Sequence, residues 1–251
     1  MSVFAADEPG AVVRPSPNFG ERRDGAAPDM IVLHYTGMAS GQAAEDWLCN
    51  PASEVSSHYL VYEDGRIVQM VREADRAWHA GKSFWQGATD INSRSVGIEI
   101  ANPGHALGYA RFPKLQVDAV IALCAGIRDR HGIRPERVLA HSDVAPGRKI
   151  DPGEKFPWRR LFEAGIGHFV PAAPIRSGEA LREGASGPAV KTVQALLARY
   201  GYGIDVTGVF DDRTRIVVEA FQRHFRPRRV DGVADGSTLR TLQRLTDALG
   251  S

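Results

Sequence analysis

The chain has little cysteine and no thiolate motif. Cys49 and Cys124 are the only two cysteines among its 251 residues, and neither belongs to a Cys-x-x-Cys pair. A structural zinc site built from thiolates is therefore not expected. Cys124 falls on the apolar stripe of an expected helix, so we predict that it is a buried apolar side chain.

An excess of charge of either sign is also absent. The 31 Lys and Arg side chains are balanced by 30 Asp and Glu side chains, which leaves a formal net charge of +1. Such a chain offers no broad electropositive field for nucleic acid. The run from Arg226 to Arg229 is a local basic cluster, and we interpret it as a solvated turn between helices. Nucleic acid is not an expected partner.

Long apolar runs are missing as well. No run approaches the roughly 20 residues that a membrane-spanning helix needs, so a transmembrane segment is not expected. The segment from Met1 to Gly10 lacks a charged stretch followed by an apolar one, and it therefore does not indicate a signal peptide.

The chemistry is concentrated in one short segment, from His141 to Gly153, with the sequence HSDVAPGRKIDPG. A catalytic zinc site usually has three protein ligands and one position left for water. His141 and Asp151 can supply two ligands, and Lys149 between them can stabilise negative charge. The candidate for the third is His34, which ends an apolar run typical of a buried strand. Each residue also has an ordinary alternative, because such a histidine is often a hydrogen-bonded core residue and Asp-Pro-Gly is a common turn.

A carboxylate interrupts a second apolar strand. Glu99 lies within Val-Gly-Ile-Glu-Ile, the segment from Val96 to Ile100. Burying an ionised carboxylate without a partner is costly. The inward Glu99 is therefore a candidate functional residue.

Four motifs follow one another in an order that carries a resemblance. They are the strand ending at His34, the segment Ser57-His-Tyr-Leu-Val61, the strand Gly97-Ile-Glu99 and the loop from His141 to Gly153. Together they resemble the zinc-dependent N-acetylmuramoyl-L-alanine amidases of the amidase-2 class, which are related to peptidoglycan recognition proteins. The resemblance covers roughly residues 15–165.

The resemblance implies a role for each residue of these motifs. His34, His141 and Asp151 are expected to bind one Zn²⁺ per catalytic domain. Glu99 is expected to be the general acid and base, and Lys149 to stabilise the developing oxyanion. The implied reaction is hydrolysis of the amide bond between N-acetylmuramic acid, or its 1,6-anhydro form, and L-alanine.

Three further residues are assigned contacts with the substrate: His58, His79 and Asn102. The aromatic neighbour of His79, in Arg76-Ala-Trp-His, favours a groove for a sugar or a peptide. For each histidine the alternative is a packed or solvent-facing side chain. The remaining histidines match no expected ligand position and are interpreted as ordinary surface or core residues: His105, His131, His168 and His224.

The fold class expected for the first part is α/β, with a mixed central β-sheet flanked by helices. The expected elements are a strand (31–34), a helix (42–48), a hairpin (59–71), a strand (96–101), a long helix (113–131), a strand (138–140) and a short helix near Trp158. We expect an N-terminal arm (1–14), a zinc amidase domain (15–165), a linker (166–180) and a helical domain (181–251).

The second part has a different pattern. Three amphipathic runs, at 190–200, 216–225 and 239–249, predict a small three-helix bundle. The turn from Val206 to Thr214 repeats as Val230 to Thr238, and each copy places an Asp as an expected helix N-cap. This part resembles the peptidoglycan-binding domain type 1, which implies anchoring to the cell wall. The alternative is a generic helical bundle.

Competing functions remain at this point. A peptidoglycan recognition module that does not cut, and a zinc peptidase acting on another amide, are the alternatives to an amidase. Peptidoglycan or a muropeptide is the expected partner, and a monomer is expected. The compartment stays open between the cytoplasm and the periplasmic wall. We expect that deletion of the residues after Gly165 lowers binding to intact wall and leaves cleavage of small fragments intact.

Overall fold

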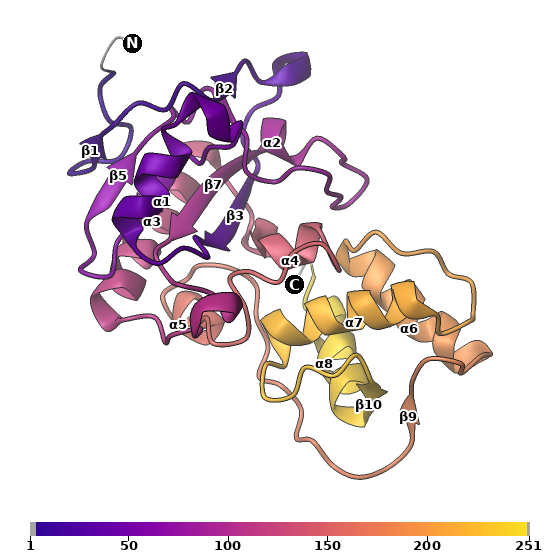
Figure 1. The fold of residues 1–251 in the computed structure, drawn as a ribbon. Coiled ribbons are helices and arrows are strands. Elements are labelled where there is room, and N and C mark those ends of the chain that lie inside the picture. The colour runs from indigo at the N-terminus through magenta and orange to yellow at the C-terminus, as the bar shows by residue number, and fades with distance from the viewer. Residues whose placement is uncertain (1–3, 250–251) are drawn as a thin grey trace.

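A computed structural model of the chain describes residues 4–249, and a six-stranded sheet forms the centre of its N-terminal region (Figure 1). The strand order is β1-β5-β4-β7-β3-β8. The bounds are β1 Val12–Val13, β3 Met30–Tyr35, β4 Tyr59–Val61, β5 Ile67–Gln69, β7 Ser95–Ile100 and β8 Val138–Ala140. Strands β4, β7, β3 and β8 run parallel, whereas β5 is antiparallel to β4. The expected mixed sheet and its hairpin are confirmed.

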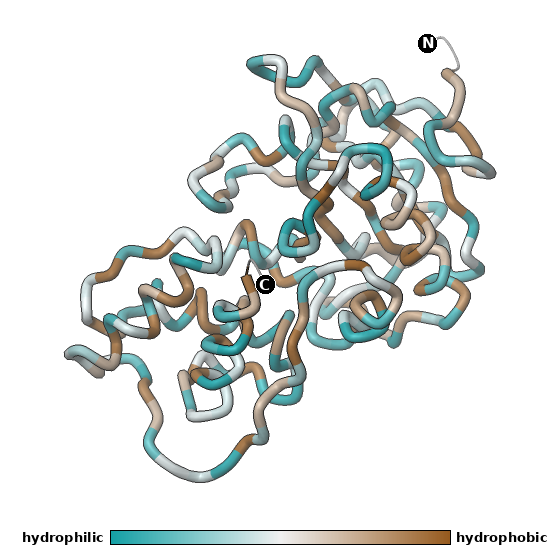
Figure 2. The backbone as a smooth tube through the Cα atoms, turned by 180° about the vertical axis from the view of Figure 1, so that it is seen from behind, coloured by the Kyte–Doolittle hydropathy of each residue, from teal (hydrophilic) through white to brown (hydrophobic). Residues whose placement is uncertain are grey.

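Alternate residues of the central strands pack on opposite faces of the sheet. Helix α3 (Lys114–His131) and α5 (Trp158–Glu163) cover the face that carries Ile31 and Leu33. Helix α1 (Gly41–Leu48) packs over β4 and β5 on the other face, where Leu48, Leu60 and Val68 belong to one hydrophobic cluster. Hydrophobic segments run through the interior of the sheet region, and many of the loops around it are hydrophilic (Figure 2).

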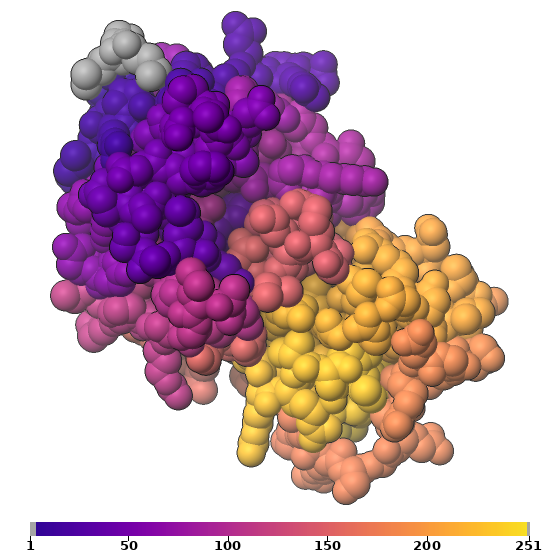
Figure 3. Space-filling view, viewed as in Figure 1, coloured from indigo at the N-terminus to yellow at the C-terminus, as the bar shows by residue number. Residues whose placement is uncertain are grey.

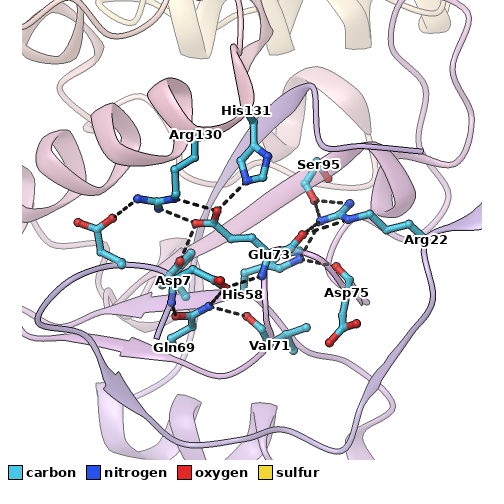
Figure 4. Close-up of polar contacts among 12 residues, drawn as sticks. Asp7, Arg22, His58, Gln69, Val71, Glu73, Asp75, Ser95, Arg130 and His131 are labelled. Atoms are coloured by element: carbon cyan, nitrogen blue, oxygen red, sulfur yellow. Dashed lines mark hydrogen bonds and ion pairs between the residues drawn. The ribbon is translucent and has the colours of Figure 1, made fainter. Parts of the chain in front are cut away.

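The described part of the expected N-terminal arm belongs to the sheet region. Its β1 adds an edge strand beside β5, and β2 (Phe19–Gly20) pairs with β6 (Arg76–Ala77). Residues 1–3 lie outside the described range. Figure 4 shows the buried carboxylate of Glu73, which joins the arm and the hairpin to the end of α3. The carboxylate accepts hydrogen bonds from Tyr59 (2.6 Å) and Arg130 (2.6 Å), and the backbone N–H of Glu73 donates to Asp7 (2.8 Å).

The C-terminal region contains the three expected helices, α6 (Pro188–Tyr200), α7 (Asp212–Phe225) and α8 (Gly236–Asp247). A two-stranded sheet of β9 (Ala180–Leu181) and β10 (Ala234–Asp235) closes its base. The expected caps are confirmed, because Asp211 accepts from the N–H of Thr214 and Asp235 from that of Thr238. Residues 250–251 of the expected helical domain lie outside the described range.

The expected linker contains no helix or strand from 166 to 179, but it is not free of the helices. Ala173 is buried, its N–H donates to Thr241, and its carbonyl accepts from Ser237. Both partners belong to α8. The connection therefore follows the surface of the helical region closely. None of the helices in the described range 4–249 is both long and apolar enough to span a membrane.

Candidate metal centre

Three adjacent parallel strands bring the first site residues together. In the register between β3 and β7, His34 lies directly opposite Glu99. On the other side of β3, Leu33 lies opposite Ala140, and His141 follows at once. Parallel strands end at the same edge of a sheet, so their last side chains meet there. The order β7-β3-β8 thus sets Glu99, His34 and His141 side by side.

A short helix and the loop after it return the third ligand to this edge. Helix α4 (His141–Val144) begins at the histidine, and the N–H of Ser142 donates to the carbonyl of Asp151 at 3.0 Å. The Nδ1 atoms of His34 and His141 lie 2.8 Å apart. Asp151 Oδ2 lies 3.2 Å from the first and 3.0 Å from the second. All three residues are buried.

The hydrogen-bond partner of each ring decides which nitrogen carries the proton. His141 Nε2 lies 3.2 Å from the carbonyl oxygen of Ala80, which can only accept, so this nitrogen is the donor. Its Nδ1 therefore presents a lone pair when the ring is neutral.

For His34, a chain of hydrogen bonds through His79 and Ser95 decides which ring nitrogen carries the proton. Ser95 donates its hydroxyl to the carbonyl of Ile91, so its oxygen is free to accept from His79 Nε2 at 3.2 Å. His79 Nδ1 is then an acceptor, and it receives the Nε2 proton of His34 at 3.0 Å. Burial and the charge of His141 lower the pKa of His34 to about 4, and burial and His34 lower that of His79 well below 6.5. Both rings are neutral at pH 7.

These assignments test whether a metal ion fits. Two imidazole lone pairs and one carboxylate oxygen converge with no hydrogen between them, an arrangement that is repulsive without a cation. Within the described residues, the same three side chains form the cluster that could hold a metal ion. The donor set suits a divalent cation with one position left open.

Glu99 lies next to this cluster, on the wall of a cavity of about 420 Å³. Its Oε2 is buried and has no hydrogen-bond partner among residues 4–249. Burial first, and then the charge of Asp151, raise the pKa of Glu99 well above 4.5, although Lys149 opposes the shift. A carboxyl group with a raised pKa beside an open coordination position is suited to exchange a proton.

Lys149 enters the same cavity from the loop after α4. Its backbone N–H donates to the carbonyl of Ala145 at 3.1 Å, which folds the loop back over the site. Arg148 lines the cavity beside it, and its guanidinium also donates to the carbonyls of Ala80 and Lys82. The cavity therefore has two cationic side chains on one wall.

Aromatic side chains form much of the remaining wall, and few of them could be identified from the sequence. Tyr35, Trp47 and Trp78 all line the cavity. Trp47 is 47% exposed although it lies on α1. The feature of the sequence that could have identified Trp47 is a large aromatic residue on the solvent-facing side of an amphipathic helix.

The three residues that were predicted to contact the substrate differ in whether they line the cavity. His79 lines the cavity, but His58 and Asn102 do not. His58 is fully buried, and its Nδ1 accepts from the N–H of Gly97 at 2.9 Å. Asn102 is buried, donates to the carbonyl of Ala110 and accepts from the N–H of Gly104. A direct substrate contact does not fit either position, because both side chains are occupied in holding the backbone.

His224 is the residue whose importance was missed. The sequence predicts an ordinary surface or core residue at this position, but its Nδ1 lies 2.7 Å from Asp143 on α4, the helix that carries His141. No spacing rule could have found this contact, since 81 residues separate the two partners.

Both regions of the chain are similar to known proteins. Residues 24–154 match the sequence profile of the N-acetylmuramoyl-L-alanine amidases, and residues 186–242 match that of a peptidoglycan binding domain. The amidase AmiD of Escherichia coli (strain K12) is 37% identical over 265 residues, which cover 98% of this chain and 93% of AmiD.

Solved structures agree over both regions. The E. coli AmiD complex with anhydro-N-acetylmuramic acid-L-Ala-D-gamma-Glu-L-Lys has a TM-score of 0.75 at 35% identity, covering 93% of this chain and 98% of AmiD. AmpDh3 of Pseudomonas aeruginosa, in complex with anhydromuramic pentapeptide, has a TM-score of 0.74 at 30% identity, covering 95% of this chain and 96% of the other. With a matched profile over half of its length and a relative aligned over nearly all of it, the chain belongs to the N-acetylmuramoyl-L-alanine amidase family.

Proposed function

We propose that the protein is a zinc amidase that hydrolyses the bond between the lactyl group of N-acetylmuramic acid, or its 1,6-anhydro form, and L-alanine. The observation that carries the proposal is the convergence of three lone pairs, from His34, His141 and Asp151, beside the unpartnered carboxyl of Glu99. The substrates named for the AmiD and AmpDh3 complexes support the choice of bond.

Zinc is the metal that this donor set favours. Two imidazole nitrogens and one carboxylate oxygen are typical of catalytic zinc sites, which keep a further position open. A bound zinc ion supplies Lewis acidity, which lowers the pKa of water and polarises a carbonyl group. His34 and His141 would hold the ion through Nδ1, because their Nε2 protons are donated to His79 and to the carbonyl of Ala80.

Glu99 and Lys149 carry the proton and the charge. Glu99 takes the proton of the attacking water and returns it to the alanine nitrogen as the C–N bond breaks, which yields a carboxylate and a free amine. Lys149 stabilises the negative charge that develops on the carbonyl oxygen. The raised pKa of Glu99 supports this role, because the carboxyl group can both accept and release the proton.

The cavity suits a ligand with a sugar and an acidic peptide. Aromatic rings such as Trp47 and Trp78 offer apolar faces to a sugar ring, and Arg148 and Lys149 offer positive charge to peptide carboxylates. We assign peptidoglycan binding to the helical region, on the match of residues 186–242. The domain boundaries given above and a monomeric state are part of the same proposal.

Zinc content and muropeptide cleavage of the wild type and Glu99→Gln test the proposal. We expect one zinc ion per chain in both proteins, and a loss of at least 100-fold in kcat in the variant, since general acid–base catalysis contributes about 10²- to 10⁴-fold. Mass spectrometry should show release of a peptide with a free L-alanine amine. Full activity in the variant would remove Glu99 from the mechanism, and binding without cleavage by the wild type would favour the recognition module.

A further inference from the structure

The helical region packs directly on the helix that carries the metal ligand His141. In Figure 1, α4 lies at the junction, between the sheet and α7, and in the space-filling view the same segment touches both regions (Figure 3). Val144 and Ala145 are buried in one hydrophobic core with Val217 and Phe221 of α7. The two regions therefore share a continuous core at this point.

A buried carboxylate lies at the centre of the contact. Asp143, on α4, has no exposed surface. Its Oδ1 accepts from the hydroxyl of Tyr202 at 2.7 Å, and its Oδ2 lies 2.7 Å from His224 Nδ1, with both partners supplied by the helical region. Burial and the charge of Asp143 raise the pKa of Tyr202 well above 10, so this hydroxyl keeps its proton and donates. A buried carboxylate needs such donors, because desolvation is costly.

Asp143 passes this contact on to the ligand segment. Its Oδ2 also accepts from the N–H of Ala140, the residue before His141, at 2.8 Å. Ser142, which lies between His141 and Asp143, donates its N–H to the carbonyl of Asp151 at 3.0 Å. The Asp143 carboxylate thus connects the start of α4, which carries His141, to Tyr202 and His224 of the helical region. Through Ser142 the same helix also holds Asp151.

The positions of these two side chains are well defined. The ring of His224 is stacked between Trp158, at 3.7 Å between centroids, and Phe225, at 3.8 Å. Tyr202 is packed against Trp85, at 4.9 Å between centroids. Beyond the helix, Ile216 of α7 lies so close to Gly147 that a Cβ there would meet it at 2.9 Å. The helical region therefore holds both α4 and the loop that follows it.

We propose that Tyr202 and His224 are positioning residues of the metal site, which act through Asp143 to hold His141 and Asp151 in their binding geometry. The inference rests on the metal site proposed above. It gives the helical region a second role, in the chemistry of the amidase itself.

The test compares single substitutions in the full-length protein. Tyr202→Phe removes one hydroxyl and keeps the packed ring, and His224→Phe removes the donor and keeps the stack. The matched control is Tyr200→Phe, because the Tyr200 hydroxyl is also buried in the same region but is paired with His168 at 3.1 Å instead of with α4. His224→Gln restores an N–H donor and serves as the conservative rescue.

Zinc affinity by chelator competition, and kcat and KM on a small soluble muropeptide, are measured for each protein. Loss of a hydrogen-bond partner of a metal ligand costs about 10- to 100-fold in metal affinity. Tyr202 and His224 act one residue further away, so we expect a loss of about tenfold in zinc affinity and in kcat, with KM unchanged. His224→Gln should recover most of the loss, and Tyr200→Phe should stay within about twofold of the wild type.

Two results would overturn the inference. If Tyr202→Phe and His224→Phe bind zinc and turn over substrate as Tyr200→Phe does, the contact with Asp143 serves stability alone. If the wild type binds no zinc, the proposed metal site fails, and the inference fails with it. The zinc content of the wild type separates the two outcomes.

Discussion

At the scale of single residues, hydrogen-bond partners outside the cluster decide what the site can bind. His34 and His141 each give their Nε2 proton to an acceptor, which leaves both Nδ1 lone pairs facing Asp151. Histidines that bind a metal commonly donate their other ring proton in this way, which fixes the tautomer and the orientation of the ring. His79 is therefore as much a part of the site as the cavity wall it forms.

His79→Ala should weaken zinc binding. Without His79, the Nε2–H of His34 loses its acceptor and the ring is free to rotate, so we expect zinc affinity to fall about tenfold. Chelator competition measures the change. His168→Ala is the control, because His168 contacts Tyr200 and lies outside the cavity lining. Equal affinity in the two variants would leave His79 a substrate contact at most.

His58 carries a prediction for the dependence of stability on pH. Its Nδ1 accepts from Gly97 and its Nε2 faces the carbonyl of Asp75, with Arg22 at 3.2 Å (Figure 4). Burial, and then the charge of Arg22, lower the pKa of His58 from 6.5 to about 3. The unfolded chain therefore binds a proton that the folded chain refuses, and the stability from neutral His58 is present above pH 6.5 and lost as the pH falls toward 3.

His58→Asn provides the comparison, since it keeps an acceptor for Gly97 and does not titrate. Below pH 6.5 the free energy of unfolding of the wild type should fall faster than that of the variant, by up to about 1.4 kcal/mol per pH unit. Denaturant titrations between pH 7 and pH 5 measure the difference. Parallel profiles would mean that the pKa of His58 is the same in the folded and the unfolded chain.

At the scale of elements, the helical region contains the same turn twice, each time held by a glutamine and followed by an Asp cap. Gln194 of α6 bonds the turn at Gly208, and Gln222 of α7 bonds the equivalent turn at Gly232. The turns end in the caps Asp211 and Asp235. The sequence repeat is thus a structural repeat in which each buried glutamine holds the turn that starts the next helix.

The two caps should differ in their effect on stability. Asp211→Ala removes an exposed cap, which costs about 1 kcal/mol. Asp235 is 6% exposed and also lies 3.6 Å from the buried guanidinium of Arg226. Asp235→Ala therefore removes a negative charge that partly compensates the buried positive charge of Arg226. We expect a loss of about 3 kcal/mol there. Urea unfolding of both variants measures it, and equal losses would show that capping alone matters.

Elements with an apolar pattern of their own could be predicted, whereas α4 and β1 could not. The 18-residue α3 and the apolar strand β3 follow from their patterns. The four-residue α4 has no period of its own, and it depends on the bond between Asp143 and Ala140 and on the packing of α7. Likewise β1 exists only because β5 lies beside it.

At the scale of the whole molecule, the shared core changes the expectation for a truncated protein. Deletion after Gly165 was expected to leave the cleavage of small fragments intact. The structure predicts the opposite, because Asp143 would lose Tyr202 and His224, and Val144 would be exposed to water. We expect a lower unfolding temperature, and a loss of at least tenfold in zinc affinity and in turnover of small muropeptides.

Cleavage of the intact protein at a protease site placed in the exposed segment 176–179 is the control. Both regions stay present there, and the shared core should hold them together. We expect the cut protein to keep its activity while the truncated protein loses it. Full activity of the truncated protein on small fragments would return the helical region to a purely wall-binding role.

The residue types and their order determined the chemistry. Two imidazoles, a carboxylate, Glu99 and Lys149 can be recognised along the chain because donor atoms belong to side chains and do not depend on the fold. The tertiary structure decided which lone pairs face one another, through His79 and Ala80, and it decided that His58 holds Gly97 while His224 reaches Asp143. Such contacts join residues tens of positions apart, and only the packed chain brings them within hydrogen-bond distance.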